Sequence, residues 1–282
     1  MHELPDRVRL VIFDLDGVVY RGAQAIAGAA ELVAWLHRSG VAVRFATNNS
    51  MVARHGYVER LGAMGIETTV DEIVTSSFAT VEHLHRHAPD IRRVMAIGAE
   101  GLREELTDSG FQTTMADDVS AAEPGGPLDE PYDALIVGLD PSFDYARLAA
   151  GMTAVAAGAR LIATNADARY PTPAGFLPGA GSIVAALAVA TGVTPEVIGK
   201  PEPAMFRAII EASGVAADQT VVVGDNPASD IAGARRAGCA SILVLTGVAD
   251  ATSVAALAGD AAPHAVADDP AAVRALLEPL VS

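Results

Sequence analysis

The chain contains very little cysteine and very little lysine. Cys239 is the single cysteine among 282 residues, which excludes an intramolecular disulfide and any zinc site built from several cysteines. We expect Cys239 to be a small buried hydrophobic residue. Of the 19 basic residues, 18 are arginine and only Lys200 is lysine. A compact ammonium can approach a small anionic centre where a broad guanidinium cannot, so we expect Lys200 to take part in chemistry. The alternative is a solvated loop lysine without a role.

Long apolar runs are also missing. The longest uncharged apolar stretches, residues 148–159 and 182–193, are shorter than the roughly 18 residues that a membrane-spanning helix needs. The first residues contain no apolar signal-peptide core before a strand-like segment begins. We therefore expect no membrane span and a cytoplasmic location.

An excess of positive charge is the third absence. The formal net charge is -16 at pH 7, and the arginines form no continuous basic block. Such a chain repels phosphate backbones, so nucleic acid is not an expected partner. A small anionic substrate stays open, provided that a metal ion and a local cation reverse the sign of the field at its site.

The apolar fraction of 51% is enough for a sizeable core, and the length suggests about two domains. Short β-branched runs alternate with alanine-rich helical segments, which is typical of a mainly parallel sheet covered by helices. The predicted fold class is therefore α/β. The helix after the strand at residues 9–13 places four apolar side chains on one face, namely Ala29, Leu32, Val33 and Leu36.

Polar residues follow four predicted strands at the point where each strand ends. These strands are expected at residues 9–13, 41–46, 197–198 and 220–223. Ligands of open parallel sheets bind outside the carboxyl ends of the strands, so the polar groups should surround one small volume. The expected members are Asp14, Asp16, Thr47, Lys200, Asp225 and Asp230. Crowded carboxylates repel one another unless a cation lies between them, and hard oxygen ligands suit Mg²⁺. The sequence therefore implies a Mg²⁺ site.

These segments, in this order, resemble the four motifs of the haloacid dehalogenase superfamily. The matching segments are DLDGV at residues 14–18, TNN at 47–49, GKP at 199–201, and GD at 224–225 followed by Asp230. The wording TNNS and GKPEP, with the long interval between them, is similar to subfamily IIA. This group includes 4-nitrophenyl phosphatases, phosphoglycolate and glycerol phosphate phosphatases, and the NagD nucleotide phosphatases. The chain departs from the family pattern at Asn226 and Pro227, although both carboxylates of the fourth motif remain.

The resemblance implies a Rossmann-like core with a large inserted α/β cap domain. We expect the core at residues 1–78 and 179–282 and the cap at residues 79–178. The inserted interval contains strand candidates at 93–97, 134–139 and 161–164 and helical stretches at 99–109 and 143–157, enough for a small sheet of its own. Residues 169–179 are dense in proline and glycine, as expected of a linker or a loop at the edge of a lid. One large domain with a decorated loop is the alternative.

By resemblance, each motif has a role in phosphate ester hydrolysis. Asp14 would be the nucleophile, and Asp16 would protonate the leaving alkoxide and then activate water. The carboxylates of Asp14 and Asp225, with the backbone carbonyl of Asp16, would hold Mg²⁺, supported by Asp230. Phosphoryl oxygens would be bound by the remaining motif residues, which are Thr47, Asn48, Asn49 and Lys200.

The resemblance therefore implies a Mg²⁺-dependent phosphatase that hydrolyses small phosphate monoesters through an aspartyl phosphate. A departing halide needs no proton, whereas an alkoxide does, so Asp16 favours esters over haloacids. The leading substrates are glycerol 3-phosphate and phosphoglycolate, followed by nucleoside monophosphates and sugar phosphates. If residues 164–176 lie over the phosphate site, only small molecules should react. A phosphomutase and a non-catalytic phosphate binder stay open, and a homodimer formed through the cap is implied by resemblance alone.

Overall fold

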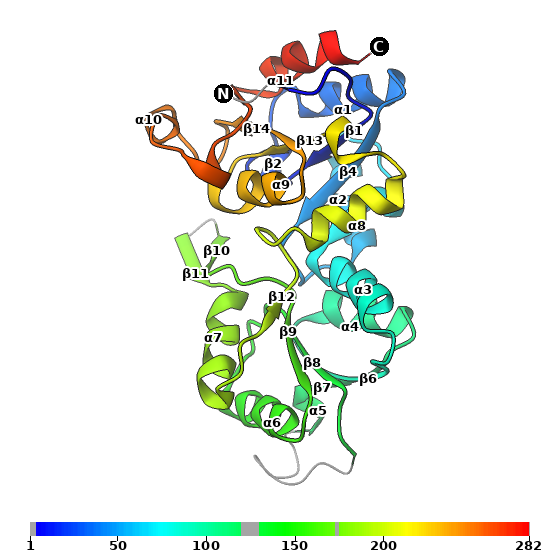
Figure 1. Cartoon of the computed structure of the whole chain (residues 1–282), viewed down its shortest axis with the longest axis vertical. Coiled ribbons are helices and arrows are strands. Elements are labelled where there is room, and N and C mark those ends of the chain that lie inside the picture. The colour runs from blue at the N-terminus through cyan, green and yellow to red at the C-terminus, as the bar shows by residue number, and fades with distance from the viewer. Residues whose placement is uncertain (1–3, 120–129, 173–174, 282) are drawn as a thin grey trace. The chain divides into compact units, whose positions relative to one another are not determined.

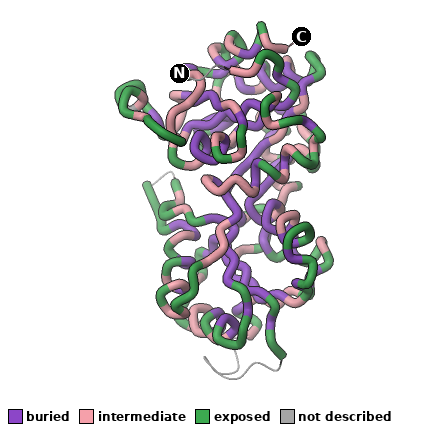
Figure 2. The backbone as a smooth tube through the Cα atoms, viewed as in Figure 1, coloured by how far each residue is buried: buried purple, intermediate pink, exposed green. Residues whose placement is uncertain are grey.

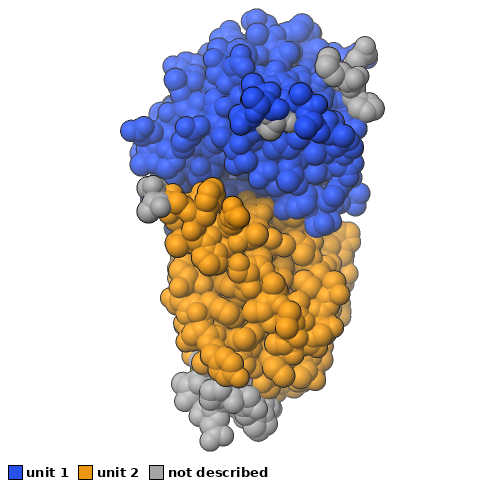
Figure 3. All heavy atoms as spheres, turned by 90° about the vertical axis from the view of Figure 1, so that its left-hand side faces the viewer, with its two compact units in different colours: residues 1–47, 54–74, 200–282 blue, residues 48–53, 75–199 orange. Residues whose placement is uncertain are grey.

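The computed structural model describes residues 4–119, 130–172 and 175–281. The described chain divides into two compact units (Figure 3): residues 1–47, 54–74 and 200–282 form the first, and residues 48–53 and 75–199 form the second. Each unit has its own parallel sheet with helices around it (Figure 1), so the predicted α/β class is confirmed. Within the described residues, every helix is too short or too polar to cross a membrane.

The first unit is built on a six-stranded sheet in the order β15-β14-β13-β1-β4-β5. The strands are β1 (Leu10–Phe13), β4 (Ala42–Thr47), β5 (Ile73–Thr75), β13 (Thr220–Gly224), β14 (Ala240–Val244) and β15 (Ala265–Ala267). β1 lies between β13 and β4 and pairs with both in parallel, and β14 and β15 continue the parallel sheet. A short antiparallel hairpin, β2 (Tyr20–Arg21) with β3 (Gln24–Ala25), follows β1.

Helices connect these strands. They are α1 (Ala29–Arg38), α2 (Arg54–Ala63), α8 (Ala204–Ser213), α9 (Ala232–Arg236), α10 (Ala251–Val254) and α11 (Pro270–Leu277). The 3-10 turns are η1 (Val70–Glu72), η2 (Ala217–Gln219), η4 (Gly259–Ala261) and η5 (Glu278–Leu280), and η3 (Pro227–Ile231) is a π-helical turn. The chain therefore alternates strand and helix as the pattern of apolar residues predicts.

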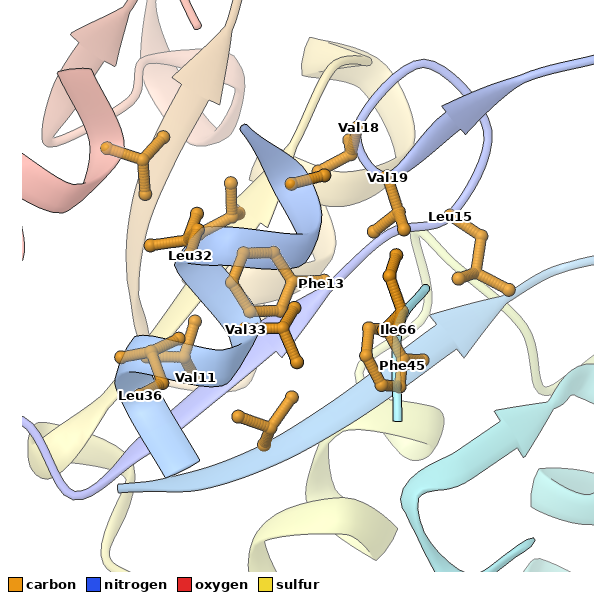
Figure 4. Close-up of a cluster of buried hydrophobic side chains, with 14 of the residues drawn as sticks. Val11, Phe13, Leu15, Val18, Val19, Leu32, Val33, Leu36, Phe45 and Ile66 are labelled. Carbon is orange, nitrogen blue, oxygen red and sulfur yellow. The ribbon is translucent and has the colours of Figure 1, made fainter. Parts of the chain in front are cut away.

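The core of the first unit lies between α1 and the centre of the sheet. The four apolar residues predicted for one face of α1 are all buried, and Leu32, Val33 and Leu36 point toward Val11 and Phe13 of β1 (Figure 4). Figure 2 shows the same centre as a continuous buried zone. Burial of these side chains contributes about 1.5–3 kcal/mol each, so the central strand is held firmly and its carboxyl end is a rigid place for functional residues.

The second unit has a five-stranded parallel sheet in the order β12-β9-β8-β6-β7. Its strands are β6 (Arg93–Ile97), β7 (Gln112–Met115), β8 (Ala134–Val137), β9 (Arg160–Ala163) and β12 (Glu196–Val197). Its helices are α3 (Ser76–His87), α4 (Glu100–Asp108), α5 (Ala116–Val119), α6 (Tyr145–Ala156) and α7 (Ala180–Thr191). The predicted strands at 93–97, 134–139 and 161–164 and both predicted helices of this interval are present, each within two residues of the expected bounds.

The unit boundaries differ from the domain bounds that we expected. Residues 48–53, 75–78 and 179–199 belong to the second unit. For residues 179–199 the reason is that α7 packs against α6 in its apolar core and β12 pairs with β9. The prediction that residues 197–198 form a strand of the first sheet was therefore wrong, because the strand found there, β12 (Glu196–Val197), joins the second sheet. A strand of two residues carries no pattern that tells which sheet it joins.

The segment expected to be a loop at residues 169–179 is mainly a β-hairpin. β10 (Arg169–Thr172) pairs with β11 (Gly175–Pro178) in antiparallel register. Residues 173–174 lie outside the described residues, and every residue of β11 is exposed. Both strands of a two-stranded ribbon are edge strands, and an edge strand tolerates proline, which has no N–H to donate. A segment rich in proline and glycine can therefore form these two strands.

Candidate active site

Three strands of the first unit end in polar residues at the same edge of its sheet. Asp14 follows β1 directly, Thr47 is the last residue of β4, and Asp225 follows β13. Because the strands are parallel neighbours, their carboxyl ends lie side by side, at the point where the chain connections diverge to either side of β1. The sheet itself therefore brings these residues together.

Lys200 lies among these groups and is 3% exposed. Its ammonium donates hydrogen bonds to the carboxylate of Asp14, to Oδ1 of Asp230 at 2.7 Å, and to the backbone carbonyl of Ala46 at 3.2 Å. All three donor positions of the ammonium thus have acceptors. The one lysine of the chain is a buried, fully paired cation at the carboxyl edge of the sheet.

Three carboxylates gather around this position. One oxygen each of Asp14, Asp225 and Asp230 lies within 4.8 Å of the other two. The carboxylate of Asp225 is also held by the backbone, because its Oδ2 accepts a hydrogen bond of 2.7 Å from the N–H of Val248. Hard oxygen donors that converge in this way, with a single ammonium to balance them, suit a divalent cation such as Mg²⁺.

Two glycines let the backbone approach Asp225. A Cβ at Gly17 would lie 2.3 Å from Oδ2 of Asp225, and a Cβ at Gly247 would lie 1.8 Å from it. Gly17 also has φ of 82°, which disfavours other residues. The hydroxyl of Thr246 donates to the carbonyl of Gly17 at 2.6 Å, which ties the two loops together. A larger residue at either glycine would displace the Asp225 carboxylate.

The electrostatics of this cluster follow from burial. Burial raises the pKa of Asp14 well above its ordinary value; Lys200 opposes this shift, whereas Asp230 and Asp225 add to it. Burial, with the charge of Asp230, raises the pKa of Asp225 to about 7. Burial by itself would lower the pKa of Lys200, but the charges of Asp14 and Asp230 outweigh it and raise the pKa. A second cation would stabilise the ionised carboxylates, since one ammonium faces three of them.

The departure from the family pattern at Asn226 and Pro227 has a clear structural result. The side chain of Asn226 accepts a hydrogen bond from Ala228, and η3 begins at Pro227. The backbone N–H of Asn226 in turn donates to Oδ2 of Asp230 at 3.1 Å. Both oxygens of Asp230 are therefore engaged, one by Asn226 and one by Lys200, which holds Lys200 in place.

Asp16 lies apart from this cluster of contacts. Its side chain is exposed, and its backbone forms a bridge with Tyr20 at the start of the β2–β3 hairpin. Partial burial raises the pKa of Asp16, while the charges of Arg60 and Arg21 lower it. An exposed carboxyl group with a raised pKa can hold a proton and pass it to a bound molecule, which is what a general acid requires.

Asn48 and Asn49 follow Thr47 and belong to the second unit. The side chain of Asn48 donates to Oδ2 of Asp167 at 3.0 Å, and the backbone carbonyl of Asn48 accepts from the side chains of Ser76 and Asn165, each at 2.7 Å. The side chain of Asn49 accepts from the N–H of Met51 at 2.8 Å and so closes a tight turn. The amides of both residues are thus engaged within their own unit.

Sequence reasoning missed several residues that position these groups. Thr246 and Gly247 follow β14, so the rule that polar or small residues end each strand could have found them. Arg21 and Arg60, which affect Asp16, lie on a hairpin and on a helix without a recognisable motif. Asn165 and Asp167, which hold Asn48, follow β9 and could have been found by the same rule.

The sequence matches two family profiles, described as haloacid dehalogenase-like hydrolase over residues 11–112 and as HAD-hydrolase-like over residues 197–273. Among curated proteins, it is 37% identical over 237 residues to the 5′-nucleotidase YutF of Bacillus subtilis (strain 168), covering 84% of this chain and 87% of that protein. It is 35% identical to an acid sugar phosphatase of Staphylococcus epidermidis, covering 84% of this chain and 86% of the relative.

Solved structures give the same picture. A hypothetical protein from Pyrococcus horikoshii OT3 superposes with a TM-score of 0.86 at 36% identity, over 96% of this chain and 99% of that one. The glycerol phosphate phosphatase Rv1692 of Mycobacterium tuberculosis, in complex with magnesium, has a TM-score of 0.84 at 31% identity, over 96% of this chain and 78% of that one. NagD of Escherichia coli K-12 has a TM-score of 0.82 at 28% identity, over 94% and 98% of the two chains.

Proposed function

Because the chain belongs to the haloacid dehalogenase-like hydrolases, in the subfamily that contains NagD and the 4-nitrophenyl phosphatases, we propose that Asp14 is the nucleophile of a Mg²⁺-dependent phosphatase. The protein is a phosphoric monoester hydrolase that acts on small phosphate esters. The observation that carries the assignment is the buried cluster in which Lys200 contacts Asp14 and Asp230 beside Asp225.

The first step transfers the phosphoryl group to Asp14. A carboxylate oxygen of Asp14 bonds to phosphorus while the ester P–O bond breaks, which splits one very slow hydrolysis into two easier steps. Lys200 orients the Asp14 carboxylate through its hydrogen bond and neutralises charge that develops on the transferred group. The electron pair of the broken bond leaves with the alkoxide.

Asp16 supplies the proton for that alkoxide. Its exposed carboxyl group gives the proton to the leaving oxygen and becomes a carboxylate. In the second step the same carboxylate takes a proton from water as the water oxygen bonds to phosphorus and the bond to Asp14 breaks. Inorganic phosphate is released, and both carboxyl groups return to their starting states.

The acidic cluster fits a Mg²⁺ ion. We assign it to the carboxylates of Asp14 and Asp225 and the backbone carbonyl of Asp16, with Asp230 beside them. When bound, Mg²⁺ offsets the repulsion among the carboxylates and stabilises negative charge on the phosphoryl oxygens. We further assign phosphoryl oxygen binding to Lys200 and to the TNN segment, Thr47, Asn48 and Asn49, by the family motif.

For the substrate we propose a small aliphatic phosphate ester, either glycerol 3-phosphate or phosphoglycolate. The magnesium-bound structural relative named as a glycerol phosphate phosphatase supports this class. A second candidate is a nucleoside monophosphate or a sugar phosphate, favoured by the higher sequence identity to relatives named 5′-nucleotidase and acid sugar phosphatase. The two candidates make different predictions for the same assay.

The test is phosphate release from a panel of esters, in Mg²⁺ and in EDTA, for the wild type and Asp14→Asn. We expect Mg²⁺-dependent release that falls by about a thousandfold or more in Asp14→Asn, since the nucleophile is lost. The ranking of glycerol 3-phosphate, phosphoglycolate, nucleotides and sugar phosphates by kcat/KM decides the substrate class.

Asp218→Asn is the matched control, because Asp218 is an exposed aspartate of η2 in the same unit. This variant should keep wild-type turnover. Release that is unaffected by Asp14→Asn would remove Asp14 as nucleophile. Absence of release from every ester by a folded wild-type protein would overturn the proposed function.

A further inference from the structure

The β2–β3 hairpin carries the backbone partner of Asp16. Asp16 bridges to Tyr20, and the N–H of Gly17 donates to the carbonyl of Tyr20 at 2.8 Å. Asp16 is therefore the residue at the base of the hairpin, although its own side chain is exposed. These backbone contacts tie the Asp16–Gly17 peptide to the hairpin, so the place of Asp16 depends on the place of Tyr20.

Arg60, on the helix α2, contacts this hairpin at two points. Its guanidinium lies over the ring of Tyr20, with the central carbon 3.9 Å from the ring centroid, and donates a hydrogen bond to the carbonyl of Gly22 at the hairpin turn. Cation–π stacking and a backbone hydrogen bond together fix both the ring and the turn. Tyr20 is 3% exposed, so the contact is partly shielded from water.

Arg21 anchors the opposite side of the same hairpin. Its guanidinium donates to the carbonyl of Thr246, whose hydroxyl is bonded to Gly17. The hairpin is thus tied by two arginines, one to α2 and one to the loop after β14. Arg21 is bonded to the loop after β14, whose Gly247 lies against Asp225, whereas Arg60 is bonded to Gly22 of the hairpin. Substitution of Arg60 therefore tests the effect of the hairpin on Asp16 without breaking a bond to that loop.

We propose that Arg60 is a positioning residue that holds the general acid Asp16 in its working orientation through Tyr20 and Gly22. This inference rests on the proposed function. The Arg60 guanidinium contacts the Tyr20 ring and the Gly22 carbonyl, and neither belongs to a side chain assigned to the nucleophile, the metal or the phosphoryl oxygens. Its loss should therefore weaken proton donation to the leaving oxygen and leave attack by Asp14 intact.

This role has a specific kinetic signature. 4-Nitrophenolate leaves easily without a proton, whereas phenolate and alkoxides depend more and more on one. The value of kcat/KM reports all steps up to departure of the leaving group, so it contains the acid-assisted step. A defect in acid positioning must grow as the leaving group becomes more basic, whereas a general loss of folded structure affects all esters equally.

The experiment compares wild type, Arg60→Met and Arg60→Lys on 4-nitrophenyl phosphate, phenyl phosphate and the best alkyl phosphate of the panel. We expect Arg60→Met to lower kcat/KM by about tenfold or more for the alkyl ester, less for phenyl phosphate, and by less than about twofold for 4-nitrophenyl phosphate. Arg60→Lys keeps the charge and loses the planar fork, so it should show the same trend with a smaller loss.

Arg38→Met serves as the matched control, since Arg38 is an exposed arginine in the last turn of α1. It should leave all three values unchanged. Thermal unfolding of each variant separates folding defects from kinetic ones. Equal loss for all esters, or no loss for any, in a folded Arg60→Met protein overturns the inference. A wild-type protein inactive on every ester overturns the proposed function instead.

Discussion

Each of the two units contains a basic residue that faces several carboxylates near the carboxyl edge of a parallel sheet, and the two clusters differ mainly in burial. In the first unit, Lys200 pairs with Asp14 and Asp230, whose side chains are 13% and 2% exposed. Water is almost excluded there. The carboxylates repel one another strongly, and burial raises the pKa values of Asp14 and Asp225.

In the second unit, Arg147 makes ion pairs with Asp140 at 3.2 Å, with Asp144 at 3.1 Å and with Asp117 at 3.5 Å. Asp117 and Asp144 are 53% and 55% exposed, so water screens their charges, whereas Asp140 is 8% exposed. A backbone hydrogen bond from Arg147 lowers the pKa of Asp144, so the ionised form of this carboxyl group is stabilised. Both clusters contain one basic residue and three carboxylates, so the number of charges does not distinguish a metal site. What distinguishes it is burial, because carboxylates that are shielded from water need an added cation to stay ionised.

The largest expected effect is on turnover, and it should differ between two exposed aspartates, Asp16 in the first unit and Asp117 in the second. We predict that Asp16→Ala lowers kcat/KM for an alkyl phosphate by about 10²–10⁴, because the leaving alkoxide loses its proton donor. Asp117→Ala, in the cluster around Arg147, should leave turnover unchanged. Steady-state phosphate release from both variants checks this. Normal turnover of alkyl esters by Asp16→Ala would remove Asp16 from the assigned role.

The next effect concerns stability and contrasts the two cations. Lys200→Met leaves buried carboxylates without a cation, so we expect the free energy of unfolding in EDTA to fall by about 3–5 kcal/mol. Arg147→Met breaks two exposed pairs and one pair with the buried Asp140, so it should cost less than Lys200→Met, about 2 kcal/mol or less. Urea unfolding of the two variants beside wild type measures both values. Equal losses would mean that burial does not distinguish the clusters.

The smallest effect is a pH dependence. The pKa of Asp225 in the folded protein is about 7, well above the ordinary aspartate value, so the metal-free folded state keeps a proton that the unfolded chain has lost. The contribution of this group to stability therefore falls as pH rises from about 4 to about 7. Mg²⁺ must displace the proton, so the rise in unfolding temperature that Mg²⁺ causes should be larger at pH 8 than at pH 5.

Asp225→Asn should lose most of the Mg²⁺-induced rise in unfolding temperature at both pH values, whereas Asp117→Asn should retain it. Thermal unfolding at pH 5 and pH 8, with Mg²⁺ or EDTA, measures these shifts. A Mg²⁺ effect that is independent of pH in the wild type would contradict the raised pKa of Asp225.

Prediction from the sequence was most successful for long elements with strong apolar patterns. The face of α1 and the strands β1, β4 and β13 came out as expected, because buried side chains repeat at the spacing of their secondary structure. The two-residue strand β12 and the hairpin at Arg169–Pro178 were misjudged, since short segments rich in proline and glycine carry little pattern. The comparisons confirm the superfamily and its inserted α/β domain.

The amino-acid sequence by itself determined the α/β class and the family. It also placed Asp14, Asp225 and Lys200 just after the ends of predicted strands, because strand ends and motif spacing are local properties of the sequence. Only the tertiary structure decided that β12 joins the second sheet, that Asp230 holds Lys200, and that Arg60 lies over Tyr20. These contacts join residues far apart in the chain. They depend on side-chain packing and on the exclusion of water, which no local pattern encodes.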